Sequence, residues 1–297
     1  MRVRVGIIIL PDQPWSVARQ RWQRAERYGF HTAWTYDHLG WRDLVDGPWF
    51  DAVPTLTAAA GVTDRIRLGT FVASANFRHP VHFAREATAL DDISAGRLVL
   101  GLGAGGAGFD ERVLGAPVLT PRQRADRFAE FVSLLDQLLR ADRVTWSGRY
   151  YTAVDARSTP GCTQRPRAPF IVAANGPRGM ALAARYGQGW VTTGTRSDDL
   201  DEWWRSVAEA AARFDDALAA GGRDPASIER HLSLDAAPVF SLSGAGYFAD
   251  AVGRAAELGF TDVATHWPRE AGWYAGREAV LEEVAGTVLA NLPSNQP

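Results

Sequence analysis

Short apolar runs alternate with longer amphipathic stretches along most of the 297-residue chain. The apolar runs predict strands at residues 3–10, 32–36, 66–73, 98–103, 170–174, 190–193, 231–240 and 261–266. The stretches between and after them predict helices at residues 15–28, 50–60, 80–93, 121–139, 177–186, 198–220, 244–258 and 270–289. This alternation is typical of βαβ units, which build a parallel sheet.

The alternation is interrupted once, after the fourth predicted helix. Residues 144–153 predict a hairpin that turns at Ser147-Gly148, and residues 158–168 are an irregular stretch with prolines at 160 and 166. Eight strand–helix units predict one (β/α)8 TIM-barrel domain over residues 1–297, with residues 144–168 as an insertion. An open doubly wound sheet uses the same alternation, but no linker divides the chain, so we favour the barrel.

In such a barrel the functional site is built where strands end and helices begin. Polar and glycine residues gather at these positions, namely Asp12, 36–38, 74–76, 103–106, 174–176, 192–194 and 265–267. His38 can donate or accept a proton near neutral pH, although a histidine bonded to backbone is the structural alternative. Trp34 and Trp41 flank it, and such tryptophans either fill the core or form the wall against a flat ring.

Two glycine-containing turns follow predicted strands. Residues 101–106 (GLGAGG) satisfy the GxGxxG pattern of a dinucleotide site. Residues 107–117 predict a loop instead of a helix, and no strand ending in an acid follows, so we favour a tight turn beneath a bound cofactor. Residues 172–179 (VAANGPRG) open a helix, where Arg178 and the helix start predict a phosphate site, with a simple turn as the alternative.

Composition narrows the chemistry further. The formal net charge of -2 argues against a nucleic-acid binder, and no apolar run approaches the roughly 18 residues of a membrane-spanning helix. The apolar start is cut off by Pro11 and lacks a cleavage site, so we expect a cytoplasmic protein. Cys162 is the only cysteine and all 32 basic residues are arginine. These counts exclude a cysteine metal cage and lysine-based chemistry, and no metal site is predicted.

The chain resembles the luciferase-like family of flavin-dependent oxidoreductases over nearly its whole length. The resemblance rests on GFHTAWTYDH (29–38), RIRLGT (65–70), RHP (78–80), EATALD (86–91), GRLVLGLGAG (96–105), WSGRYY (146–151), AANG (173–176) and GQGW (187–190), in the expected order. The family fold is the (β/α)8 barrel that the alternation predicts. Its members use FMN or the deazaflavin coenzyme F420, and the Asp-His ending of the second strand is similar to the F420 branch.

The resemblance also implies a site. His38 is expected to lie by the reactive ring carbon and to move a proton, and Asp37 to touch the cofactor. A non-proline cis peptide is expected at Phe71–Val72, behind the ring. Trp41 and His266 match residues that face the substrate. The positions that the resemblance and the phosphate argument assign to the cofactor are Phe71, Val72, Ser74, Gly103, Ala104, Gly105, Ala174, Asn175, Gly176, Arg178, Gly179 and Thr193.

One departure affects the substrate. F420-dependent sugar-phosphate dehydrogenases carry a catalytic glutamate directly after the glycine turn, where this chain has Gly106, and the chain has no lysine for a phosphate. We therefore expect an F420-dependent oxidoreductase that acts on another small organic substrate, as a homodimer. The alternatives are an FMN-dependent monooxygenase, which takes O2 and reduced flavin from a partner reductase, and a non-catalytic flavin-binding protein.

Overall fold

Eight parallel strands close into a barrel in the order β1-β10-β9-β8-β7-β4-β3-β2. The computed structural model describes residues 3–292, so residues 1–2 and 293–297 of the expected domain lie outside the described residues. The closed sheet confirms the predicted barrel and rules out the open doubly wound sheet. Its strands are β1 (Arg4–Ile8), β2 (Thr32–Thr35), β3 (Arg67–Ser74), β4 (Leu98–Gly103), β7 (Phe170–Ala173), β8 (Gly189–Thr192), β9 (Glu229–Ser233) and β10 (Asp262–His266).

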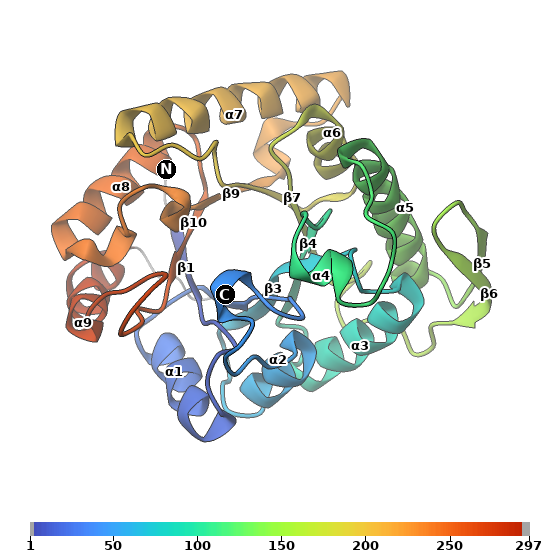
Figure 1. Ribbon diagram of the computed structural model, residues 1–297, viewed down its shortest axis with the longest axis horizontal. Helices are drawn as coiled ribbons and strands as arrows, with labels where there is room; N and C mark the ends of the chain where they lie inside the picture. The colour runs from blue at the N-terminus through green and yellow to red at the C-terminus, as the bar shows by residue number, and fades with distance from the viewer. Residues whose placement is uncertain (1–2, 293–297) are drawn as a thin grey trace.

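The long helices form a ring around this barrel (Figure 1). They are α1 (Trp15–Arg27), α2 (Ala52–Ala60), α3 (Pro80–Ile93), α5 (Pro121–Arg140), α6 (Pro177–Tyr186), α7 (Leu200–Ala220), α8 (Ala245–Glu257) and α9 (Glu278–Thr287). The short α4 (Phe109–Arg112) lies inside the ring, near β4. Of the helices in the described residues, none combines the length and the apolar character needed to cross a membrane.

The predicted hairpin is an antiparallel pair, β5 (Arg143–Ser147) and β6 (Thr152–Arg157), which lies outside the ring beyond α5 (Figure 1). Glu130 of α5 holds its turn. The Glu130 carboxylate accepts hydrogen bonds from Trp146 Nε1 at 3.2 Å and from the backbone N–H groups of residues 149–151, the shortest at 2.9 Å from Tyr151. One half-buried carboxylate therefore fastens the insertion to the barrel.

Trp34 fills the interior of the barrel and is only 2% exposed. A Cβ at Gly6 would lie 2.6 Å from Trp34 Nε1, and a Cβ at Gly69 would lie 2.5 Å from Trp34 Cζ3. Glycine on both neighbouring strands therefore makes room for the indole. Trp34 is a core residue, so of the two roles open to it from the sequence, the wall of a ligand site is wrong.

Three predicted elements differ from the structure. The strand at 231–240 ends at Ser233, because Leu234–Ala236 forms a 3-10 turn that Asp235 ties to Ser241 N and His266 N. The helix at 270–289 begins only at Glu278, because Arg269 pairs with Ala275 in a loop. The loop at 107–117 contains α4. All three differences lie at the carboxyl end of the barrel strands.

The amino-terminal end of the barrel is closed by ion pairs. Arg4 contacts Asp262 at 2.6 Å and Glu229 at 2.7 Å, and His231 Nε2 lies 3.2 Å from Glu229. Glu229, His231 and Asp262 lie close enough to share a metal ion, but Arg4 already occupies both carboxylates. We therefore interpret this cluster as a stabilising network, which suits this end of a TIM barrel.

Candidate active site

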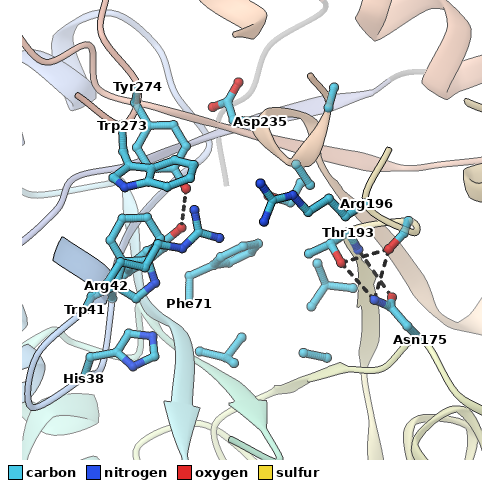
Figure 2. Close-up of a pocket in the computed structure, with 18 of the residues that line it drawn as sticks. His38, Trp41, Arg42, Phe71, Asn175, Thr193, Arg196, Asp235, Trp273 and Tyr274 are labelled. Atoms are coloured by element: carbon cyan, nitrogen blue, oxygen red, sulfur yellow. Dashed lines mark hydrogen bonds between the residues drawn. The ribbon is translucent and has the colours of Figure 1, made fainter. Parts of the chain in front are cut away.

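A cavity of about 630 Å³ opens at the carboxyl ends of the barrel strands. Every barrel strand from β2 to β10 contributes to its lining, either directly or through the loop that follows it. Figure 2 shows aromatic side chains on one side of the cavity and the Asn175–Thr193 contact on the other. The cavity lies where the strand-end argument places the functional site.

The floor of the cavity is apolar and is formed by Phe71, Val72, Ala173, Ala174 and Val191. The Phe71–Val72 peptide bond is cis, as the resemblance implies. The ring of Phe71 meets Trp34 edge to face at 5.4 Å. The floor is thus supported directly by the filled barrel interior.

The glycines of the GLGAGG turn are needed for packing. A Cβ at Gly101 would lie 2.1 Å from Thr70 O, and a Cβ at Gly103 would lie 2.4 Å from Val72 Cγ2. Gly105 has φ +71, and a Cβ there would lie 2.4 Å from Asn76. Only Gly105 of these three lines the cavity. Close approach of β4 to β3 therefore explains the pattern without a nicotinamide site.

His38 lies on the rim of the cavity and is held by Asp110 of α4. His38 Nδ1 lies 2.5 Å from Asp110 Oδ2. Asp110 Oδ1 accepts the backbone N–H groups of Leu39 at 2.8 Å and Gly40 at 3.3 Å. Because a carboxylate only accepts hydrogen bonds, Nδ1 carries a proton and Nε2 keeps its lone pair in the neutral ring. The sequence does not single out Asp110, because residues 107–117 predict a loop and the structure forms α4 there.

Asp37 lies beneath the cavity and does not line it. Its carboxylate pairs with Arg78, whose Nη2 lies 2.7 Å from Oδ1 and whose Nε lies 3.0 Å from Oδ2. It also accepts the backbone N–H of Ser74 at 3.4 Å. Asp37 therefore joins the end of β2, which leads into His38, to the end of β3. This geometry assigns it a positioning role.

Asn175 and Thr193 form the wall opposite the aromatic side chains (Figure 2). Asn175 Nδ2 donates to Thr193 Oγ1 at 2.8 Å, and Asn175 Oδ1 accepts from Thr192 Oγ1 at 2.6 Å. α6 starts just behind, at Pro177, and within the described chain no side chain caps its first turn. Arg178 forms an ion pair with Asp126 of α5. Its guanidinium, which the sequence predicts to bind a phosphate, therefore already has an acidic partner.

The aromatic side of the cavity, formed by Trp41, Trp273 and Tyr274, holds the side chain of Arg42. Trp41 and Tyr274 stack at 6.0 Å, and the Arg42 guanidinium lies 4.5 Å from the Trp41 ring and 3.9 Å from the Trp273 ring. Figure 2 shows Arg196 reaching into the cavity from the other side. Neither Arg42 nor Arg196 has a hydrogen bond or an ion pair with any described residue. The cavity lining therefore offers two guanidinium groups to an anionic ligand, beside the carboxylates of Asp198 and Asp235.

His266 lies behind this aromatic side and is 1% exposed. The Tyr274 ring stacks on it with 3.5 Å between ring centroids. His266 Nδ1 lies 2.8 Å from Asp235 Oδ2, and Nε2 lies 2.9 Å from the Tyr36 hydroxyl. A direct substrate contact, which the resemblance implies for His266, would therefore require Tyr274 to move.

The structure brings about half of the predicted site residues to the cavity surface. Those that line it are His38, Trp41, Phe71, Val72, Ser74, Gly105, Ala174, Asn175 and Thr193. Those that do not are Asp37, Gly103, Ala104, Gly176, Arg178, Gly179 and His266. Sequence reasoning missed Arg42, Arg196, Asp235, Trp273 and Tyr274, which come from loops without a motif.

Comparisons with known proteins identify the family. A family model described as luciferase-like monooxygenase matches residues 3–238. An F420-dependent glucose-6-phosphate dehydrogenase from Beutenbergia cavernae is 37% identical over 201 residues, which are 66% of this chain and 58% of that protein. An F420-dependent hydroxymycolic acid dehydrogenase from Mycobacterium tuberculosis is 31% identical over 214 residues, 71% of this chain and 56% of that protein.

The fold agrees with a solved structure. The F420-dependent tetrahydromethanopterin reductase from Methanopyrus kandleri superimposes with a TM-score of 0.80 at 20% identity, covering 99% of this chain and 100% of that chain. At this identity the likeness shows the fold alone. The chain spans a little over half the length of the curated relatives it matches. It belongs to the luciferase-like monooxygenase family.

Proposed function

We propose that this protein is an F420-dependent oxidoreductase that transfers a hydride between the deazaflavin ring and a small organic substrate. The observation that carries the proposal is the F420 dependence named for both relatives, at 37% and 31% identity. Their substrates are not transferred with it.

The residues of the cavity fit a flat ring with an anionic tail. Phe71, Val72 and Ala174 form an apolar floor on which a ring can stack. Gly105 leaves bare backbone at the edge of this floor. The uncapped start of α6, behind Asn175, is suited to a phosphate. The ring supplies the hydride chemistry when bound, and the chain supplies binding and orientation.

His38 is the proton donor or acceptor in this proposal. Its neutral ring presents a lone pair at Nε2, because Asp110 holds the proton on Nδ1. If Nε2 takes up a proton, the charge of the imidazolium is balanced by the Asp110 carboxylate, as in other His–Asp pairs. Asp110 thus orients the ring and compensates its charge, while Asp37 holds the strand end below.

The exclusion of a sugar phosphate stays a prediction and loses part of its support. It rested on Gly106 and on the lack of lysine. Arg42 and Arg196 supply the cavity with two unpaired cations, and arginine binds phosphate through a planar fork. Asp110, at the start of α4, also supplies an acid shortly after Gly106 in the sequence. The identity of the substrate therefore has to come from experiment.

Titration of the cofactor-free protein with oxidised F420 and with FMN tests the proposal. Trp41 and Trp273 line the cavity, so we expect F420 at micromolar concentration to quench tryptophan fluorescence and FMN to do so weakly. Ala174→Phe, which fills the floor, should abolish the quenching. Ala279→Phe, on the exposed face of α9, should retain it. The lack of F420 binding to the folded protein would overturn the proposal.

The second candidate is an FMN-dependent monooxygenase, favoured by the description of the family model. It requires O2 and a partner reductase, and the apolar floor would accept an isoalloxazine ring equally well. FMN binding stronger than F420 binding, together with O2 uptake in the presence of reduced FMN, would establish it. The homodimer, the reductase partner and the cytoplasmic location stay proposals under either candidate.

A further inference from the structure

Four side chains form one hydrogen-bonded chain from a buried acid to the cavity. Asp235 contacts His266, His266 contacts the Tyr36 hydroxyl at 2.9 Å, and the Tyr36 hydroxyl lies 2.9 Å from the Tyr274 hydroxyl. They come from the ends of β2, β9 and β10 and from the loop after β10. Tyr36 and Tyr274 both line the cavity, whereas His266 does not. Figure 2 shows the Tyr274 hydroxyl in this contact.

The chemistry of each group determines which partner donates in each of these hydrogen bonds. The Asp235 carboxylate accepts from His266 N at 2.6 Å and from His266 Nδ1 at 2.8 Å, so Nδ1 carries a proton. Burial lowers the pKa of His266, so the ring is neutral at neutral pH and Nε2 has a lone pair. Tyr36 therefore donates to Nε2 and accepts from Tyr274. The hydrogen-bonded series therefore ends at the cavity in the Tyr274 oxygen, which is free to accept a hydrogen bond from a ligand.

The charged groups around these four side chains favour movement of a proton from the tyrosines toward His266. Burial raises the pKa of Tyr274 to about 12, and Asp235 acts in the same direction, while the nearby Arg42 guanidinium lowers it. Arg42 therefore stabilises a negative charge on the tyrosine oxygens, and Asp235 stabilises a positive charge on His266. Tyr274 itself is held at φ +62, a costly conformation for a residue with a side chain. The loop is thus strained to place this ring over His266.

We propose that the hydroxyl pair of Tyr36 and Tyr274 is a binding site for a hydroxyl group of the substrate, and that His266 takes up the proton of that hydroxyl through the pair. The substrate class is then an alcohol with a hydrogen on its hydroxyl-bearing carbon, which is oxidised. The oxidation rests on the proposed function, whereas the binding site does not depend on it.

The step balances with an oxidised deazaflavin as the oxidant. The C–H bond of the alcohol breaks, and its electron pair leaves with the hydrogen as a hydride, which reduces the deazaflavin. The O–H proton passes to Tyr274, the Tyr274 proton to Tyr36, and the Tyr36 proton to His266 Nε2. The alcohol becomes a carbonyl compound, oxidised by two electrons. In this route the O–H proton goes to His266 in place of His38, the acceptor in the proposed function, whose ring lies 5.8 Å from that of Tyr36.

Binding of 4-nitrophenol to the cofactor-free protein tests the site without the cofactor. The control ligand is 4-nitroanisole, which has the same ring but no hydroxyl to donate. We expect 4-nitrophenol to bind about tenfold more tightly, as a hydrogen bond to a polarised acceptor provides. Its bound form should also absorb as the phenolate at a pH at which the free ligand is neutral.

Variants that remove a single hydroxyl test whether the tyrosine pair, and not another part of the cavity, binds the phenol. Tyr274→Phe keeps the ring stacked on His266 and removes only the hydroxyl. The variant should therefore bind 4-nitrophenol and 4-nitroanisole about equally. Tyr36→Phe should do the same. Tyr150→Phe is the matched control, because the Tyr150 hydroxyl is buried and lies outside the cavity lining. Thermal unfolding of each variant checks that it is folded.

The outcomes are distinct. Equal binding of the two ligands, binding of neither, a preference that survives in folded Tyr274→Phe, or a preference lost only in His38→Ala would each overturn the proposal. F420 binding without the phenol preference rejects the hydroxyl site alone. The phenol preference without F420 binding supports the site and rejects the proposed function alone.

Discussion

Replacing Asp110 with asparagine is expected to invert the tautomer of His38. Asp110 Oδ1 accepts the N–H groups of Leu39 and Gly40, whereas Oδ2 accepts from His38 Nδ1. In Asp110→Asn the amide oxygen must keep the two backbone bonds, so the amide nitrogen faces His38. An amide nitrogen only donates. Nδ1 therefore loses its proton, and Nε2, which the proposed function uses as acceptor, becomes protonated.

The size of the effect follows from the bonds involved. Three hydrogen bonds change from charge-assisted to neutral, and we expect a loss of about 1–2 kcal/mol in the free energy of unfolding. The effect on turnover is larger, because the ring then holds its proton on the nitrogen that should receive one. We expect a fall in kcat of about 10²–10⁴ once a substrate is in hand.

Nitrogen-15 NMR of the histidine rings measures the tautomer directly. His38→Gln identifies the His38 signals among those of the six histidines. Glu111→Gln is the matched control, because Glu111 is on the same short helix but faces Leu119 N and Arg124. A folded Asp110→Asn protein in which Nδ1 of His38 is still protonated would refute the assigned hydrogen-bond direction.

Three further predictions concern the scaffold. Gly69→Ala should destabilise the protein by about 2–4 kcal/mol in urea unfolding, because its Cβ would lie 2.5 Å from Trp34 and 2.6 Å from Val99 O; Gly253→Ala, with no atom within 4 Å, should be neutral or stabilising. Glu130→Gln should cost about 1–2 kcal/mol and speed proteolysis of the hairpin, since four donors lose a charged acceptor; unchanged cleavage would contradict this. Burial, aided by Arg4 and Arg67, lowers the pKa of His31 to about 4 from 6.5. Only the unfolded chain gains a proton between these values, so stability should fall by up to about 3 kcal/mol as the pH falls through this window; His31→Gln should flatten this part of the stability curve.

The eight strand–helix units could be predicted because each is a local pattern. Pro80–Ile93, Leu98–Gly103 and Pro177–Tyr186 have the predicted bounds, since proline or glycine marks one end of each. The strand predicted to reach Phe240 ends at Ser233 because Asp235 is bonded to His266, about thirty residues away in the chain. No window around Asp235 contains that partner.

The candidate site was predicted best where it is made of strand ends and glycine turns. Phe71, Gly105 and Asn175 line the cavity because the barrel topology brings strand ends together. Asp110, Arg42 and Tyr274 lie in loops whose conformation depends on long-range contacts, so nothing in their local sequence marks them. The resemblance implies a substrate contact for His266, but only the structure shows that Tyr274 covers its ring.

The central claim is that the cavity binds a deazaflavin ring beside His38. A crystal structure of the protein soaked with oxidised F420 tests it most directly. The account predicts the ring on Phe71 and Val72, with one edge within about 3.5 Å of His38 Nε2, and the phosphate near the start of α6. A ring bound elsewhere, or an unchanged cavity at saturating F420, would contradict it.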